Sequence, residues 1–148
     1  MLSCAVFALV GIPPAIAQQS NLRFEDLQSI ERADLDKIPS GCSFLLRDKA
    51  NNIVMISTSV TDRNVSFWIK TAGKLSQALG KAVKTKEPGF INFWNGKSGK
   101  TLMHMQKLTV EGNRNKPGED SLFHGKATIE FRTGAAAQKI TASWEAGC

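Results

Sequence analysis

Strict alternation of apolar and polar residues near the end of the chain is the feature that most constrains its fold. From Phe123 to Arg132, and again from Lys139 to Glu145, every second side chain is apolar or small and those between are polar or charged. Successive side chains of a strand point to opposite faces of a sheet, so each stretch predicts a strand with one buried and one wet face. The intervening segment, 133–137, contains glycine and predicts a turn. Together these residues predict an antiparallel hairpin packed on a core.

The same two-residue period recurs upstream. Further strands are expected at 43–48, 53–59, 65–70, 75–79, 90–94 and 101–110. Turns are expected at 49–52, at 71–74 and at Asn95-Gly96, and the polar stretches 81–89 and 111–121 are expected to be loops. About eight short antiparallel strands, with a turn every 8–12 residues or so, are typical of a small barrel or sandwich. The predicted fold is therefore mainly β, with residues 42–148 forming a single domain.

The region before this domain has a different pattern. Apolar residues between Leu22 and Ile38 recur at mostly helical spacing, acidic residues lead the segment, and Pro39 ends it. We expect one short N-terminal helix, or two turns, within a leader that covers residues 18–41.

The first seventeen residues resemble a secretory signal peptide. An apolar run is broken by Pro13-Pro14 and is followed by Ala15-Ile16-Ala17, an A-x-A cleavage pattern. The run is too short and too broken to span a bilayer, which takes roughly 20 apolar residues. We expect cleavage between Ala17 and Gln18, a periplasmic or secreted protein, and no transmembrane span in the mature chain.

The mature chain would keep two cysteines, Cys42 and Cys148. Two cysteines in an exported chain most simply pair. Such a disulfide would close a loop of about 100 residues and remove on the order of 4–5 kcal/mol of unfolded-chain entropy. The sequence contains no CxxC motif and no Cys/His cluster, which would indicate a redox or metal role.

The charge of the chain is concentrated in its middle. The formal net charge is +6, and the segment 64–110 carries eight lysines against one acid, Glu87. A surface of one sign attracts oppositely charged partners over a Debye length of about 8–10 Å. The alternative is a solvated surface whose lysines keep strand edges from aggregating. The candidate anion-binding residues are Lys70, Lys74, Lys81, Lys84, Lys86, Lys97 and Lys100.

Motifs with catalytic or metal-binding chemistry are incomplete. Gly99-Lys100-Thr101 ends like a phosphate loop, but Trp94 stands where that loop needs its first glycine, so we expect a hairpin turn. Met103-His104-Met105 contains copper-type donors, but on a strand His104 faces away from both methionines. The spacing of the acidic residues singles out no carboxylate pair for glycoside cleavage. We therefore expect neither an enzyme nor a cofactor.

Aromatic residues allow a third kind of function. Trp68, Trp94 and Trp144, with the phenylalanines near them, could line the mouth of a ligand-binding barrel or simply form the core. Nucleic-acid binding by lysines and aromatics would also be chemically feasible, but it fits an exported protein poorly.

Several motifs resemble known exported proteins. Gly41-Cys42-Ser43-Phe44, Phe67-Trp68-Ile69-Lys70 and the closing Trp144–Cys148 are similar to small uncharacterised exported proteins of proteobacteria. Residues 42–105, with Phe93-Trp94 before a glycine-lysine turn, also resemble periplasmic C-type lysozyme inhibitors. That resemblance implies an eight-stranded antiparallel barrel with a disulfide, and it points to Lys97 as an inhibitory residue. The family's Ser-Gly-x-x-Tyr segment would fall near Lys86–Gly89 and is missing here.

From these features we expect a non-catalytic, exported binding or accessory protein of the cell envelope. Its lysine-rich face would bind an anionic lipid, a lipopolysaccharide, a glycan or an acidic protein. The alternatives are an inhibitor of a lysozyme-type hydrolase and a carrier of a small apolar ligand.

Overall fold

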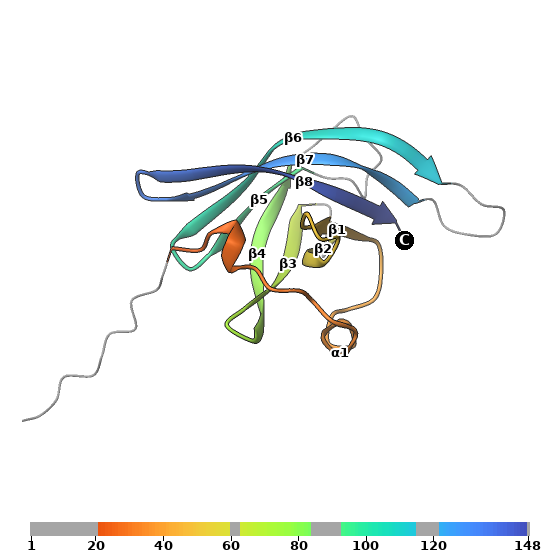
Figure 1. Ribbon diagram of the computed structural model, residues 1–148, viewed down its shortest axis with the longest axis horizontal. Coiled ribbons are helices and arrows are strands. Elements are labelled where there is room, and N and C mark those ends of the chain that lie inside the picture. Colours follow the sequence, from red (N-terminus) through yellow and green to blue (C-terminus); the bar gives the residue numbers. More distant parts are fainter. Residues whose placement is uncertain (1–20, 60–62, 84–92, 115–121, 148) are drawn as a thin grey trace, which may run out of the picture.

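Figure 1 shows a computed structural model of the chain, which describes residues 21–59, 63–83, 93–114 and 122–147. The predicted signal peptide, Lys84, Lys86 and Cys148 lie outside these residues. The strands are β1 (Ser43–Arg47), β2 (Ile53–Ser59), β3 (Asn64–Thr71), β4 (Lys74–Val83), β5 (Phe93–Ser98), β6 (Thr101–Arg114), β7 (Leu122–Thr133) and β8 (Ala136–Gly147).

The eight strands form one closed antiparallel barrel. Each strand pairs with its neighbours in sequence, and β1 closes the barrel by pairing with β8, from Ser43 opposite Gly147 to Arg47 opposite Ser143. The predicted β fold is confirmed, and of the two predicted architectures the structure has the barrel. Because the strands alternate in direction, the turns that join β1–β2, β3–β4, β5–β6 and β7–β8 lie at the same end, called here the turn end.

The predicted C-terminal hairpin is confirmed. β7 and β8 pair from Phe123 opposite Ala146 to Thr133 opposite Ala136. Ile129, Phe131 and Trp144 point into the barrel and are buried, as the alternation predicts. The rings of Phe44 and Trp144 stack 5.4 Å apart across the β1–β8 seam.

Three strand boundaries differ from the prediction. β4 continues to Val83, so residues 81–83 belong to a strand and not to a loop, and β6 continues to Arg114. The predicted turn at Asn95-Gly96 is wrong, because both residues lie inside β5 and the turn is at Gly99-Lys100.

The position of Gly96 explains why the Asn-Gly signal fails here. Gly96 pairs with Gly80 across β4 and β5. A Cβ atom at either position would lie 2.4 Å (Gly80) or 2.7 Å (Gly96) from the Phe67 ring. The two glycines therefore make room for a fully buried phenylalanine, and this packing outweighs the local preference for a turn.

The N-terminal segment crosses the turn end as a strap, defined here as residues 22–38. It contains a 3₁₀ turn, η1 (Phe24–Asp26), and a one-turn helix, α1 (Arg32–Leu35), so of the two expected alternatives the segment has two short turns. The strap passes β4 and β3 before α1 in Figure 1. Its residue Gln28 forms an antiparallel bridge with Lys70 of β3.

Hydrogen bonds attach the strap to strands far away in sequence. The backbone nitrogen of Leu22 donates to Thr101 Oγ1 over 3.0 Å, and that of Phe24 donates to Gln138 Oε1 over 3.1 Å. The backbone nitrogen of Ile30 donates to the carbonyl oxygen of Ile53 over 2.7 Å. Leu27 is buried in the core between these anchors. The strap thus forms one layer over the turn end of the barrel.

No helix within the described residues is long and apolar enough to cross a membrane.

Candidate functional site

Four of the seven candidate lysines lie exposed on one region of the wall. Lys74 and Lys81 are on β4, Lys97 is on β5, and Lys100 is in the turn between β5 and β6. Lys107 of β6 is exposed as well. We call the surface of β4, β5, β6 and the β5–β6 turn that carries these five lysines the lysine face. Lys74 shares the inward register of Ala78 and lies at the turn-end rim of this face, whereas Lys81, Lys97 and Lys107 point outward from the barrel. Lys84 and Lys86 lie outside the described residues, as does the Lys86–Gly89 segment where the inhibitor family carries its motif.

Lys70 has a different role. Its Nζ lies 2.8 Å from Asp34 Oδ2 of the strap, and only 17% of its side chain is exposed. The hydrogen bond from Lys70 lowers the pKa of Asp34 below its ordinary value, and the same bond raises the pKa of Lys70. The sequence predicted a solvent-facing Lys70, but its charge is already compensated within the fold, so it is not available to a partner.

Among the described residues, β4 and β5 carry no carboxylate, and β6 carries only Glu111 near its end. No acidic residue occurs between Asn64 and Val83 or between Phe93 and Val110. Within the described residues, none of its five lysines takes part in a salt bridge; the bridges that do occur lie on other elements. Within the described residues, these five positive charges therefore have no carboxylate partner.

Exposed apolar side chains lie among these lysines. Among the described residues, five large apolar side chains are exposed. Leu79, Val83 and Leu102 lie on the outer face of β4 or β6, whereas Val110 shares the inward register of Leu108. Leu79 is 69% exposed and Leu102 is 50% exposed. Strand pairing places Lys97 opposite Leu79 on one side and opposite Leu102 on the other. The centre of the face is thus a leucine–lysine–leucine row.

These leucines were not expected from the sequence. On β4, Leu79 directly follows Ala78, so the two side chains lie on opposite faces. Since Ala78 is buried, Leu79 must point outward. Which face of β4 points inward could not be decided before the barrel was known.

Other parts of the barrel compensate their charges. Arg47 Nη2 lies 2.9 Å from Glu145 Oε2 across the β1–β8 seam. Glu130 is buried and accepts hydrogen bonds from Arg132 and Gln106. Burial opposes the ionisation of Glu130, but Arg132 and Lys139 outweigh it and lower the pKa of Glu130.

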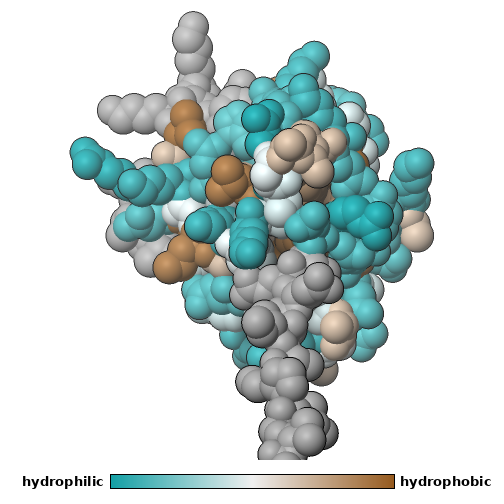
Figure 2. Space-filling view, turned by 90° about the vertical axis from the view of Figure 1, so that its left-hand side faces the viewer, coloured by the Kyte–Doolittle hydropathy of each residue, from teal (hydrophilic) through white to brown (hydrophobic). Residues whose placement is uncertain are grey.

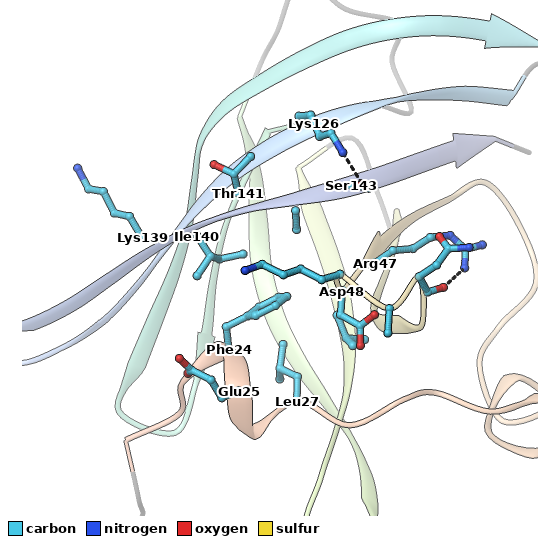
Figure 3. A pocket seen from close by; sticks show the side chains of 15 residues that line it. Phe24, Glu25, Leu27, Arg47, Asp48, Lys126, Lys139, Ile140, Thr141 and Ser143 are labelled. Carbon is cyan, nitrogen blue, oxygen red and sulfur yellow. Dashed lines mark hydrogen bonds between the residues drawn. The ribbon is translucent and has the colours of Figure 1, made fainter.

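A groove of about 1040 Å³ lies between the strap, the β1–β2 turn and β8. Figure 3 shows Phe24 and Leu27 of the strap beneath Ile140 of β8. β1 ends at Arg47, opposite Ser143, so it does not pair with residues 136–142 of β8. The groove lies beside this part of β8. Its lining contains four cations (Arg47, Lys49, Lys126 and Lys139) and two acids (Glu25 and Asp48). Arg47 and Lys139 have carboxylate partners, so its remaining charges nearly balance.

Buried side chains fill the barrel, including two of the predicted aromatics. Phe67 and Trp144 are almost fully buried among Leu46, Met55 and Ile129. The indole nitrogen of Trp144 donates to the carbonyl oxygen of Thr109 over 3.2 Å. The side chains of Phe93 and Trp94 are outside the described part. The groove between the strap and β8 lies outside this packed core.

The remaining motifs have structural positions. Met103 and Met105 point inward, whereas His104 is exposed and hydrogen-bonds to Asn95. Gly99, with a positive φ of 56°, forms the β5–β6 turn as predicted. In the part of the chain that is described, no group of three or more His, Cys, Asp or Glu residues could hold a metal ion.

Figure 2 shows the side of the molecule that is on the left in Figure 1. Apolar side chains form separate patches there, each bordered by hydrophilic ones.

Comparison with known proteins finds no matching family model, no matching curated protein and no matching solved structure.

Proposed function

We propose that this protein is an exported, non-catalytic binding protein of the cell envelope, and that the lysine face binds an anionic partner. The observation that carries the proposal is the set of five lysines on the lysine face, none of which has a carboxylate partner among the described residues. Elsewhere on the described barrel, several cations are compensated by acids of the same chain.

Electrostatics makes this face the best candidate for binding. An exposed lysine that already has a carboxylate partner gains little from an external anion, because the partner would have to be displaced. In the described part of the chain, the lysines of the face have no such competitor. Their fields add over distances comparable to the Debye length of about 10 Å at 0.1 M salt. The interaction is therefore expected to be sensitive to salt.

Export is supported by the sequence pattern of residues 1–17, and a Cys42–Cys148 disulfide is part of the proposal. The pairing of Ser43 with Gly147 supports it, because the next residues outward on the two strands are Cys42 and Cys148. Such a bond would fasten the β1–β8 seam where the barrel closes.

The test is retention on a column of immobilised heparin, a polyanion without an apolar part. Protein purified after export should bind at about 0.05 M NaCl and elute well below 0.5 M or so, because salt screens exposed charges. The triple variant Lys81→Gln, Lys97→Gln, Lys100→Gln should elute much earlier. The matched control Lys37→Gln, Lys49→Gln, Lys126→Gln changes three exposed lysines outside the face and should elute close to the parent protein.

Circular dichroism should show the same β spectrum for every variant. Equal elution of the triple variant and the parent protein, or elution that does not depend on salt, would contradict the proposal.

A further inference from the structure

We propose that the anionic partner is the surface of a lipid bilayer, and that Leu79 and Leu102 enter it while the lysines contact the headgroups. This inference rests on the proposed function and names the partner of the same face. It starts from the coincidence of two features that are separate in sequence: the uncompensated lysines and most of the exposed large apolar side chains.

The geometry of the central row suits a bilayer surface. Leu79, Lys97 and Leu102 occupy paired positions on three adjacent strands. Neighbouring strands are about 4.8 Å apart, so the two leucines are separated by roughly 10 Å with one ammonium group between them. Lys81 is two residues beyond Leu79 on the same face of β4. Both apolar groups can therefore reach the same surface while two lysines stay at headgroup level.

The leucines distinguish a bilayer from other polyanions. A glycan or a soluble acidic polymer offers charge but no apolar interior, so it would leave Leu79 and Leu102 in water. A bilayer offers both phosphate groups and hydrocarbon. Lysine stems can lie along apolar surface while their charged ends remain in the polar layer. A bilayer can therefore contact the lysine and both leucines of the central row.

The wall behind the row keeps it in place. Gly80 and Gly96 lie between the outward-facing residues and pack directly on the Phe67 ring inside the barrel. The buried Phe67 ring therefore supports the backbone on which Leu79 and Lys97 are placed. Among the described residues, Leu35 of α1 is the only large exposed apolar side chain that is not on β4 or β6. A substitution at Leu35 therefore tests whether loss of any exposed leucine weakens binding.

The experiment measures sedimentation with vesicles of phosphatidylglycerol mixed with phosphatidylcholine, and with vesicles of phosphatidylcholine alone. The parent protein should bind the mixed vesicles and bind the neutral ones far less. The double variant Leu79→Ser, Leu102→Ser should bind the mixed vesicles on the order of tenfold more weakly, since each leucine side chain gains from leaving water. Its elution from heparin should not change.

Matched variants complete the design. Leu35→Ser should leave vesicle binding unchanged. Lys97→Gln should weaken it about fivefold, as expected for one lysine near an anionic membrane surface. If the leucine variant binds mixed vesicles as tightly as the parent protein, the partner is a different polyanion and this inference is wrong, although the heparin result can still support the proposed function. Loss of heparin retention in the leucine variant would mean that the face as a whole is disturbed, and it would also overturn the inference.

Discussion

The two sides of this barrel use their charges differently. Around β1, β3, β7 and β8, three carboxylates compensate four cations: Glu145 with Arg47, Asp34 with Lys70, and Glu130 with Arg132 and Lys139. On β4, β5 and β6, five lysines stand near exposed leucines and valines, and none of them has a salt bridge within the described residues. The first group holds elements of the fold together. The second group contributes little to the fold, which leaves it free for a partner.

This difference implies that substitutions on the two sides should separate stability from binding. Changes at the compensated side should lower the free energy of unfolding and leave the affinity of the folded protein intact. Changes on the lysine face should do the reverse.

The largest effect is expected at the seam between β1 and β8. Cys42→Ser removes the proposed bond to Cys148, which closes a loop of about 100 residues, and should lower the free energy of unfolding by about 4 kcal/mol. Urea unfolding followed by tryptophan fluorescence measures the change. The parent protein in reducing agent should behave like the variant. An unchanged midpoint in both cases would show that the seam is held by its strand pairing alone.

A smaller loss of stability is expected where the strap meets β3. Asp34→Asn removes the carboxylate partner of Lys70 and should lower the urea midpoint at pH 7. Because the folded-state pKa of Asp34 is lowered below its ordinary value of 3.8, its contribution is present above that pH and is lost as the pH falls through the folded value. Because the pKa of Lys70 is raised above 10.5, its contribution persists up to that pH and is lost only above it.

The comparison for Asp34→Asn is therefore a pair of stability curves against pH. Between about pH 5 and pH 9 the parent protein should be more stable than the variant by a nearly constant margin. Below pH 4 or so the two curves should approach each other. Parallel curves down to the lowest pH would mean that this carboxylate does not act through its charge.

The smallest effect on stability is expected on the lysine face. Leu79→Ser should change the free energy of unfolding by less than about 0.5 kcal/mol, because the side chain is already mostly in water. Ile69→Ala, at a residue of β3 that is 1% exposed, should cost about 2–5 kcal/mol in the same urea experiment. A large cost at Leu79 would show that this leucine belongs to the fold, and the distinction between the two sides would then fail.

Much of the fold could be predicted from the sequence, but not the closure of the barrel. The alternation in β7 and β8 identifies both strands and their buried faces, because that pattern is local. It cannot distinguish a barrel from a sandwich, since both bury one face of each strand. Gly96 shows the limit clearly, because its place in β5 depends on Phe67, which lies 29 positions earlier in the numbering.

The candidate site could be predicted in part for the same reason. Its lysines are visible as a run of one charge in the sequence. Lys70 does not belong to this set because it is paired with Asp34, which is 36 residues away in the sequence. The leucines became part of the site only when the pairing of three strands placed them on either side of Lys97.

The hydrogen bond between Phe24 and Gln138 has a consequence for the order in which the domain assembles. Its two residues are 114 positions apart, so it cannot form until β8 has taken its place in the barrel. The strap is synthesised before every strand it contacts, and yet its Phe24 end can dock on the turn end only after the last of them. Until then Phe24 remains uncovered, and a newly made chain would expose it for as long as barrel closure takes.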